Sequence, residues 1–301
     1  MTSNLAFVFP GQGSQSVGML SELAQTYPII KNVYTQASEV LGYDLWSITQ
    51  NGPDEQLNQT EITQPALLAA SYALYQIWLE KDAVEPQLMA GHSLGEYSAL
   101  VCAGAIDFAI GIEVVSKRGL YMQQAMRGKS GSMAAIVGLE DHEVAAICHE
   151  AANGDVLSPA NYNSIGQVVI AGEKSAVERA IVLAEKAGAR LAKEIPVSVP
   201  CHCSLMTEAA AKLADTLAKI EIRAPKIPVI HNVDLLSHSD PNAIRKALIL
   251  QIDHPVRWVE TIQLMAQKGI TNIAECGPGK VLCGLIKRID KRIVTQSLMD
   301  I

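Results

Sequence analysis

The stretch from Met89 to Leu100, MAGHSLGEYSAL, holds residues whose types and spacing could supply a nucleophile. Its GHSLG core is a G-x-S-x-G sequence centred on Ser93, with an apolar run before it that predicts a strand and residues after it that predict a helix. In such a strand-turn-helix the glycines allow a sharp turn, so the serine hydroxyl stands clear of the sheet. The alternative is an ordinary turn in which Ser93 caps the helix. The strand and helix on either side favour the nucleophile.

A serine hydroxyl needs a base to take its proton, and histidine is the usual one. His92 directly precedes Ser93 and is expected to point away from it. His202 follows two prolines in PVSVPCHCSLM, where it could face a cleft, and His231 and His254 remain alternatives. The other histidines lie in polar helical or loop segments and are expected to be structural or solvated: His142, His149 and His238.

Two glycine-rich turns could suggest nucleotide binding. The first, FPGQGSQ, has Ser16 where the third glycine of a dinucleotide fingerprint belongs and lacks the acidic residue further on. The second, CGPGKVL, has Ala274 in place of the first glycine of a phosphate loop and Val281 in place of its Ser or Thr. Both readings are therefore weak. The backbone N–H groups around Gln12 could instead face an anion, and beside Ser93 they would form an oxyanion hole.

The elements around these residues alternate between short apolar strands and helices such as Pro65 to Glu80 and Ile106 to Met126, which predicts an α/β fold. Between residues 129 and 198 the order becomes βαββαβ, the pattern of a ferredoxin-like unit. We therefore predict a core formed by residues 1–128 and 199–301, with the smaller unit inserted and a cleft between them.

Composition narrows the function classes. The chain has 301 residues, 49% of them apolar, and a net charge of −7 with interspersed signs, so no basic stripe for nucleic acid is present. No apolar run approaches a membrane span and the first residues resemble no signal peptide, so a cytoplasmic enzyme is expected. The six cysteines lack the spacing of a disulfide scaffold. Cys201, His202 and Cys203 lack further ligands at a usable spacing, so no metal is expected.

Eight segments, taken together, resemble bacterial malonyl-CoA:acyl carrier protein transacylases, from about residue 5 to about residue 296: FPGQGSQ, TQPALL, GHSLGEYSAL, SKRGLYMQ, VPCHCSLM, HNVD, HPVRW and GPGKVL. The resemblance implies an α/β-hydrolase-like core with an inserted ferredoxin-like subdomain. It also implies malonyl-CoA and the phosphopantetheine thiol of acyl carrier protein as substrates, no cofactor, and a monomer.

The resemblance assigns roles residue by residue. Ser93 matches the nucleophile and His202 the base, whose ring is oriented by a backbone carbonyl that would belong to Gln251. Gln12 and Leu94 match the residues whose N–H groups stabilise the oxyanion. Such a dyad needs no carboxylate as a third member. The residues alone favour none of the three candidate carboxylates over the others: Asp234, Asp253 and Glu275.

Arg118 matches the residue that grips the free carboxylate of the malonyl group, for which a planar guanidinium is suited. Without the resemblance, a solvated helix charge would be the expectation. Gln64 aligns with a polar residue of the same pocket, although a glutamine at a helix start ahead of Pro65 is the alternative. The implied reaction is ping-pong transfer through a malonyl-serine ester.

Three alternatives remain at this point. The protein could be a free-standing acyltransferase of polyketide synthesis, since the same family includes such enzymes. It could be a thioester hydrolase that uses the same dyad with water. It could also be a non-enzymatic module that binds a carrier protein, although such a module would need a broken dyad. Cys201 and His231 depart from the residues common in the family, so methylmalonyl stays open as a substrate. Because carrier proteins are acidic, a basic docking patch is expected, with Lys117 and KRIDKR, Lys287 to Arg292, as candidates.

Overall fold

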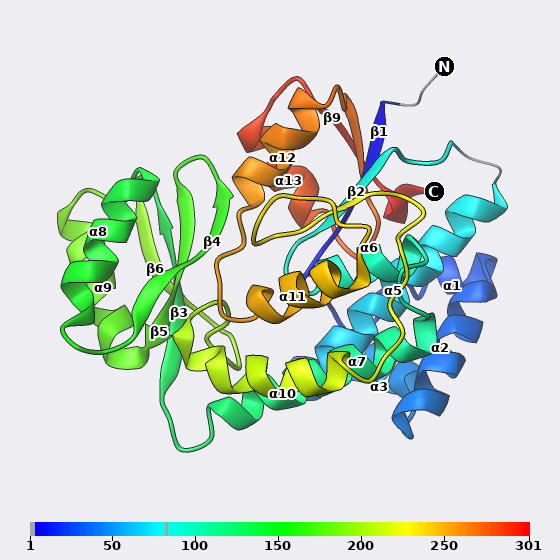
Figure 1. Cartoon of the computed structure of the whole chain (residues 1–301), viewed down its shortest axis with the longest axis horizontal. Helices are drawn as coiled ribbons and strands as arrows, with labels where there is room; N and C mark the ends of the chain where they lie inside the picture. The colour runs from blue at the N-terminus through cyan, green and yellow to red at the C-terminus, as the bar shows by residue number, and fades with distance from the viewer. Residues whose placement is uncertain (1–3, 82–83) are drawn as a thin grey trace.

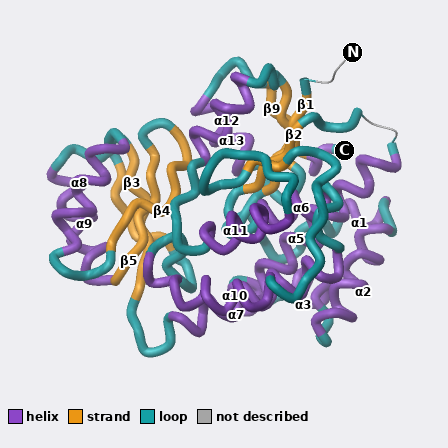
Figure 2. The backbone as a smooth tube through the Cα atoms, in the orientation of Figure 1, coloured by secondary structure: helices purple, strands orange, loops and turns teal. Residues whose placement is uncertain are grey.

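The larger part of the molecule is built on a parallel sheet. The computed structural model describes residues 4–81 and 84–301, and Figures 1 and 2 show two separate sheets. In the larger sheet all pairings are parallel and the strand order is β7-β2-β1-β8-β9. Its strands are β1 (Leu5–Phe9), β2 (Leu88–Gly91), β7 (Val229–Ile230), β8 (Asn272–Glu275) and β9 (Val294–Ser297).

Helices cover both faces of this sheet, as the continuous apolar run LAFVF of β1 requires. Phe7 and Phe9 belong to the cluster shared with helices α5 and α7, whereas Ala6 and Val8 belong to the cluster shared with α12 and α13. The helices of this part are α1 (Leu23–Thr26), α2 (Ile29–Leu41), α3 (Leu45–Asn51), α4 (Asp54–Leu57), α5 (Thr60–Glu80), α6 (Gly95–Cys102), α7 (Phe108–Ala125), α10 (Thr207–Leu217), α11 (Pro241–Gln251), α12 (Trp258–Gln267) and α13 (Val281–Ile289). No described helix is long and apolar enough to cross a bilayer.

The smaller sheet is antiparallel and lies beside the larger part, at the left of Figure 1. Its strand order is β4-β5-β3-β6, and helices α8 and α9 pack on one face through a separate apolar cluster. The order along the chain is the expected βαββαβ. The elements are β3 (Gly131–Val137), α8 (Asp141–Ala152), β4 (Leu157–Ser164), β5 (Gln167–Glu173), α9 (Lys174–Lys186) and β6 (Leu191–Ile195).

Backbone pairing joins the two parts next to the GHSLG turn. The N–H of Tyr162 in β4 donates to the carbonyl of Val256 at 3.0 Å, and the N–H of Val256 donates to the carbonyl of Ala160 at 2.9 Å. His92 Nε2 lies 2.7 Å from Asn163 Oδ1. The smaller sheet is thereby fixed against the turn that carries Ser93.

Some element boundaries differ from the sequence predictions. Helix α5 begins at Thr60, five residues before Pro65, so the expectation that this helix starts at the proline is wrong. A proline is favoured in the first turn because its missing N–H is unpaired there, but this one stands further inside. The short strands β7 and β9 were not predicted, because two to four residues carry too little alternation to be recognised.

Candidate active site

The turn between β2 and α6 gives Ser93 a strained backbone. Its φ is 52°, in the left-handed region that residues with side chains rarely adopt. A Cβ on Gly91 would lie 1.8 Å from the Gly95 carbonyl carbon, and a Cβ on Gly95 would lie 2.0 Å from the carbonyl oxygen of Phe9. Both glycines are thus required by close backbone approach, and the turn has the geometry of a nucleophile elbow.

Side chains from distant segments hold the backbone on both sides of Ser93. The N–H of Ser93 donates to Asn232 Oδ1 at 2.9 Å, and Asn232 Nδ2 donates to the Gly91 carbonyl at 2.7 Å. Gln251, the last residue of α11, donates from Nε2 to the carbonyl of Ser93 at 2.8 Å. These bonds hold the strained turn in place without using the Ser93 hydroxyl.

His202 stands directly against that hydroxyl. Its Nε2 lies 2.7 Å from Ser93 Oγ, while Nδ1 lies 2.8 Å from the carbonyl of Gln251 and 3.1 Å from the carbonyl of His254. Because carbonyl oxygens only accept, Nδ1 carries the proton and Nε2 is left as the acceptor for the serine hydroxyl. The ring therefore has the tautomer that a general base requires.

The protonation state of His202 also suits a base. Burial, together with the positive charge of Arg118, lowers its pKa to about 3. The imidazole is therefore neutral at neutral pH. His231 and His254, the other candidates, do not contact Ser93 Oγ through their rings; their ring Nδ1 atoms lie 2.7 Å from Glu96 Oε1 and 2.6 Å from Asp253 Oδ1, respectively.

The carboxylates that sequence reasoning left open all have other partners. Glu275 accepts from two N–H groups at the start of α13, at 2.8 and 3.1 Å. Asp253 contacts the ring that follows it in the chain, and Asp234 contacts His238 at 2.7 Å. Across residues 4–81 and 84–301, no carboxylate hydrogen-bonds to His202. The arrangement is a serine–histidine dyad oriented by backbone carbonyls.

Arg118 reaches the site from the middle of α7 and is fully buried, so the expectation of a solvated helix charge is wrong. It donates to Gln64 Oε1 at 2.8 Å, to Gln251 Oε1 at 3.0 Å and to Ser93 Oγ at 3.3 Å. Its guanidinium lies 5.5 Å from the Tyr97 ring centre, and Nε has no partner in the described structure.

No described carboxylate forms an ion pair with Arg118. A buried positive charge without a counter-ion is costly, so an anion placed beside this guanidinium would be stabilised. Gln64 is also fully buried and contacts Arg118 from inside α5, so its side chain lines this site and does not mark a helix start. The pair places a guanidinium beside Ser93, and such a group can bind a carboxylate through two hydrogen bonds.

Gln12 and Leu94 lie on the two turns that meet at Ser93. A Cβ on Gly11 would be 2.5 Å from the carbonyl oxygen of His92, which shows how closely the Gln12 turn packs on the elbow. Leu94 follows Ser93 and is buried. Neither N–H donates a hydrogen bond to another of the described residues. Both remain available to an oxyanion next to the serine.

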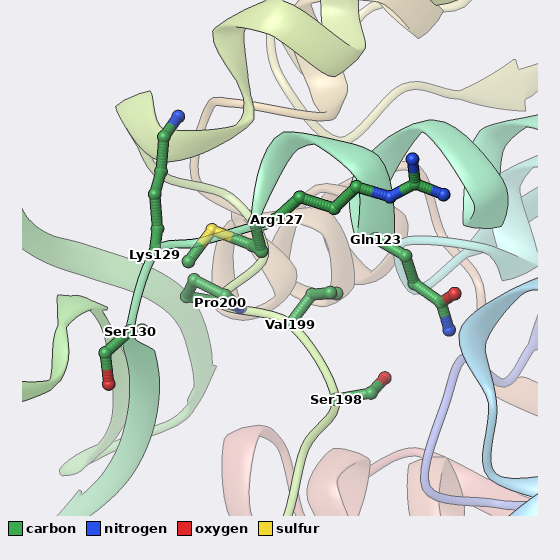
Figure 3. Close-up of a pocket in the computed structure, with 9 residues that line it drawn as sticks. Gln123, Arg127, Lys129, Ser130, Ser198, Val199 and Pro200 are labelled. Carbon is green, nitrogen blue, oxygen red and sulfur yellow. The ribbon is translucent and has the colours of Figure 1, made fainter.

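A pocket of about 330 Å³ lies where α7 ends. Gln123, Arg127, Lys129 and the segment Ser198–Pro200 line part of it, and in Figure 3 the two basic side chains extend away from Ser198. Ser198 Oγ lies 2.5 Å from Thr60 Oγ1, which in turn accepts a bond from the Gln12 side chain at 3.4 Å. The pocket is thereby linked to the Gln12 turn, and its lining includes neither Ser93 nor His202.

Cysteines flank His202 but take no part in these contacts. Burial raises the pKa of Cys201 to about 11 and that of Cys203 to about 12, so both thiols are protonated at neutral pH. Their sulfur atoms face backbone carbonyls at 3.6 and 3.4 Å. Within the described part of the chain, no group of three or more His, Cys, Asp or Glu is arranged to hold a metal ion.

Sequence reasoning missed Glu96 and the role of Asn232. Glu96 is a fully buried carboxylate in the first turn of α6, and it accepts a bond from the Asn232 N–H at 2.9 Å. A signal was present, because a lone acidic residue followed by YSALVCAGA, without a basic residue nearby, needs a distant partner. The sequence does not say which residue that partner is.

Comparison with known proteins agrees with this geometry. Residues 6–291 match the family model described as acyl transferase domain. The chain is 54% identical over 298 residues to the malonyl CoA-acyl carrier protein transacylase of Escherichia coli strain K12, covering 99% of this chain and 96% of that protein.

Two solved structures are also close. The malonyl CoA-acyl carrier protein transacylase of Coxiella burnetii is 53% identical with a TM-score of 0.98, over 99% of this chain and 94% of that one. A malonyl-transacylase in complex with its type II PKS acyl-carrier protein is 51% identical with a TM-score of 0.97, over 98% of this chain and 96% of that one. The chain therefore belongs to the family of malonyl CoA-acyl carrier protein transacylases.

Proposed function

We propose that the protein transfers a malonyl group from malonyl-CoA to the phosphopantetheine thiol of acyl carrier protein, through an ester on Ser93. The observation that carries this proposal is Arg118, a fully buried guanidinium without a counter-ion whose Nη2 lies 3.3 Å from the Ser93 hydroxyl. An acyl group attached to Ser93 that ends in a carboxylate would meet this charge. Malonyl is the smallest common acyl group of that kind.

In the first half-reaction His202 takes the Ser93 proton at Nε2 as the serine oxygen attacks the thioester carbonyl. The N–H groups of Gln12 and Leu94 hold the oxyanion, each worth about 3 kcal/mol in comparable sites. The imidazolium then gives its proton to the departing coenzyme A thiolate, and the carbonyls of Gln251 and His254 stabilise the charged ring. The product is the malonyl-serine ester.

In the second half-reaction the thiol of holo acyl carrier protein attacks the ester. His202 takes the thiol proton and returns a proton to Ser93 as the serine leaves, which regenerates the free enzyme. Arg118 keeps the malonyl carboxylate in one place during the exchange, so the ester carbonyl stays aligned with the oxyanion donors. No metal or cofactor takes part in either step.

The finer fold assignment is part of the proposal. The elbow between β2 and α6 supports an α/β-hydrolase-like core of residues 1–128 and 199–301, and the strand order of the smaller sheet, with both helices on one face, supports a ferredoxin-like subdomain of residues 129–198. We also propose a monomer that acts in the cytoplasm, without nucleic acid or membrane partners.

The carrier protein is proposed to dock on basic side chains near the end of α13. Two of the candidate cations have acidic neighbours, since Lys117 pairs with Glu113 at 2.6 Å and Arg292 pairs with Asp290 at 2.7 Å. The remaining cations of KRIDKR are therefore the better candidates. Among them Arg288 Nη1 donates to Gln167 Oε1 of the smaller sheet at 2.8 Å.

The transfer itself is tested with malonyl-CoA and holo acyl carrier proteins of fatty-acid and type II polyketide origin. We expect malonyl-carrier protein to form in excess of free malonate, with the fatty-acid carrier as the better acceptor. Release of malonate to water without transfer to either carrier would show a hydrolase and overturn the proposal.

A further inference from the structure

Two buried ionisable groups, Glu96 and His231, lie beside the dyad and have no role in the chemistry above. His231 Nδ1 lies 2.7 Å from Glu96 Oε1, and both side chains are fully buried. Burial lowers the pKa of His231 but the carboxylate of Glu96 raises it more, so the net pKa is raised. The His238 ring centre lies 5.1 Å away, and Asp234 adds a second negative charge nearby. The His231 side chain therefore holds one oxygen of the Glu96 carboxylate in place.

The other oxygen of Glu96 faces the active site. Its Oε2 accepts from the Asn232 N–H at 2.9 Å and from Gln251 Nε2 at 3.0 Å. Gln251 Nε2 also donates to the carbonyl of Ser93. Glu96 therefore contacts both residues whose side chains hold the turn at Ser93: the backbone of Asn232 and the side chain of Gln251.

Glu96 and the Ser93 carbonyl together fix which way the Gln251 amide faces. A carboxylate can only accept, so the NH₂ group of Gln251 must point at Glu96 and the Ser93 carbonyl, and its oxygen must point at Arg118. The reversed amide would place NH₂ against the guanidinium and oxygen against two acceptors. Glu96 thus reinforces the orientation in which the Gln251 oxygen accepts from Arg118.

The amide also separates the two opposite charges. Glu96 and Arg118 form no ion pair, because Gln251 lies between them and bonds to both. A direct ion pair would neutralise the guanidinium and reduce its attraction for a substrate carboxylate. Through the amide, Arg118 is oriented and remains unpaired.

We propose that Glu96, held by His231, is a positioning residue that sets the preference for carboxylate-bearing acyl groups by orienting Arg118 through the Gln251 amide. The inference rests on the proposed function, because the preference concerns the acyl group carried by Ser93. Neither Glu96 nor His231 touches the substrate.

The test compares kcat/KM for malonyl-CoA with kcat/KM for acetyl-CoA in the loading of the intact protein, with the melting temperature of each variant measured alongside. His231→Leu removes the donor to Glu96, and we expect the malonyl-to-acetyl ratio to fall about tenfold or more. His231→Asn places an N–H near the position of Nδ1, so the ratio should return to within about threefold of wild type. His149→Leu on the exposed face of α8 is the matched control and should change nothing.

A second variant keeps the test decisive if His231→Leu does not fold. Gln251→Met removes the amide and keeps the backbone carbonyl that orients His202, so the same ratio should fall by a similar factor. If both variants fold, the double variant should fall no further than the more damaged single one, because the two residues act along one chain of contacts.

The outcomes separate the inference from the proposed function. A wild-type protein that loads no malonyl group would overturn the proposed function itself. A wild type that loads and prefers malonyl, with His231→Leu or Gln251→Met losing malonyl and acetyl loading in parallel, would overturn the positioning role alone. An unchanged ratio in Gln251→Met would also overturn it.

Discussion

Replacement of Arg118 by methionine should change the acyl preference of the enzyme without weakening its fold. The variant keeps a long side chain in α7 but removes the buried guanidinium that donates to Gln64, Gln251 and Ser93. A malonyl group on Ser93 would then place its carboxylate in a closed site with no positive partner. An acetyl group has no carboxylate and loses nothing.

The magnitude follows from the burial of Arg118, whose exposed fraction is 0%. Removing one partner of a buried ion pair costs about 3–5 kcal/mol, because the other charge stays behind unpaired. At about 1.4 kcal/mol per factor of ten, kcat/KM for malonyl-CoA should fall about 140- to 4,000-fold. Loading from acetyl-CoA should stay within about threefold, since only the dyad and the oxyanion donors act on it.

Stability should respond in the opposite sense to activity. Arg118 is a buried charge for which the described residues provide no counter-ion, and its Nε has no partner among them. Methionine removes that cost, so the melting temperature should stay the same or rise. Lys117→Met, one residue earlier on α7, is the matched control. Its exposed pair with Glu113 is worth at most about 1 kcal/mol, so neither preference nor stability should change appreciably.

The assay is loading by intact mass at several concentrations of malonyl-CoA and of acetyl-CoA, with thermal unfolding of the same samples. Equal losses for both thioesters, at an unchanged melting temperature, would show that Arg118 supports the dyad and does not select the substrate. Full retention of the malonyl preference in Arg118→Met would refute the reasoning directly.

Two further predictions follow from burial and backbone geometry. The pKa of His202 is lowered from 6.5 to about 3, so between these values the unfolded chain binds a proton that the folded chain does not, and the free energy of unfolding should fall as pH falls through this window. Urea unfolding at a series of pH values measures how steeply the free energy of unfolding depends on pH, and this dependence should be weaker in His202→Gln. An equal pH dependence in that variant would show that other groups cause it. Gly95→Ala would place a Cβ 2.0 Å from the Phe9 carbonyl oxygen and should lower the free energy of unfolding by about 3 kcal/mol or more. Gly284 lies inside α13 with open space where a Cβ would be, so Gly284→Ala should raise the free energy of unfolding by up to about 1 kcal/mol. Thermal unfolding of both variants compares them, and a Gly95→Ala protein as stable as Gly284→Ala would contradict the elbow packing.

The sharp turn that carries Ser93 was predictable from sequence because its requirements are local. A strand, two glycines and a helix fall within a dozen residues around Ser93, and the structure gives each glycine a short-range reason. The order of the smaller unit was predictable for a similar cause, since its strands and helices each extend over enough residues to show their period.

The partners of Ser93 could not be chosen from the residues alone. His202 is 109 positions away along the chain, and the pairing of Glu96 with His231 spans 135. These contacts depend on how α11, β7 and the segment after Pro200 converge, and no local pattern records that convergence. The family resemblance predicted the roles of His202 and Arg118. Glu96 lies in the segment GHSLGEYSAL, but only its contacts in the structure indicate what it does.

The central claim, that Ser93 carries the acyl group with His202 as its base, is tested most directly by brief mixing with malonyl-CoA followed by intact mass and peptide mapping. The account predicts a single malonyl ester on Ser93, none in Ser93→Ala, and loading about 10²- to 10⁴-fold slower in His202→Gln. A malonyl adduct on another residue, or one that persists at full rate in Ser93→Ala, would contradict it.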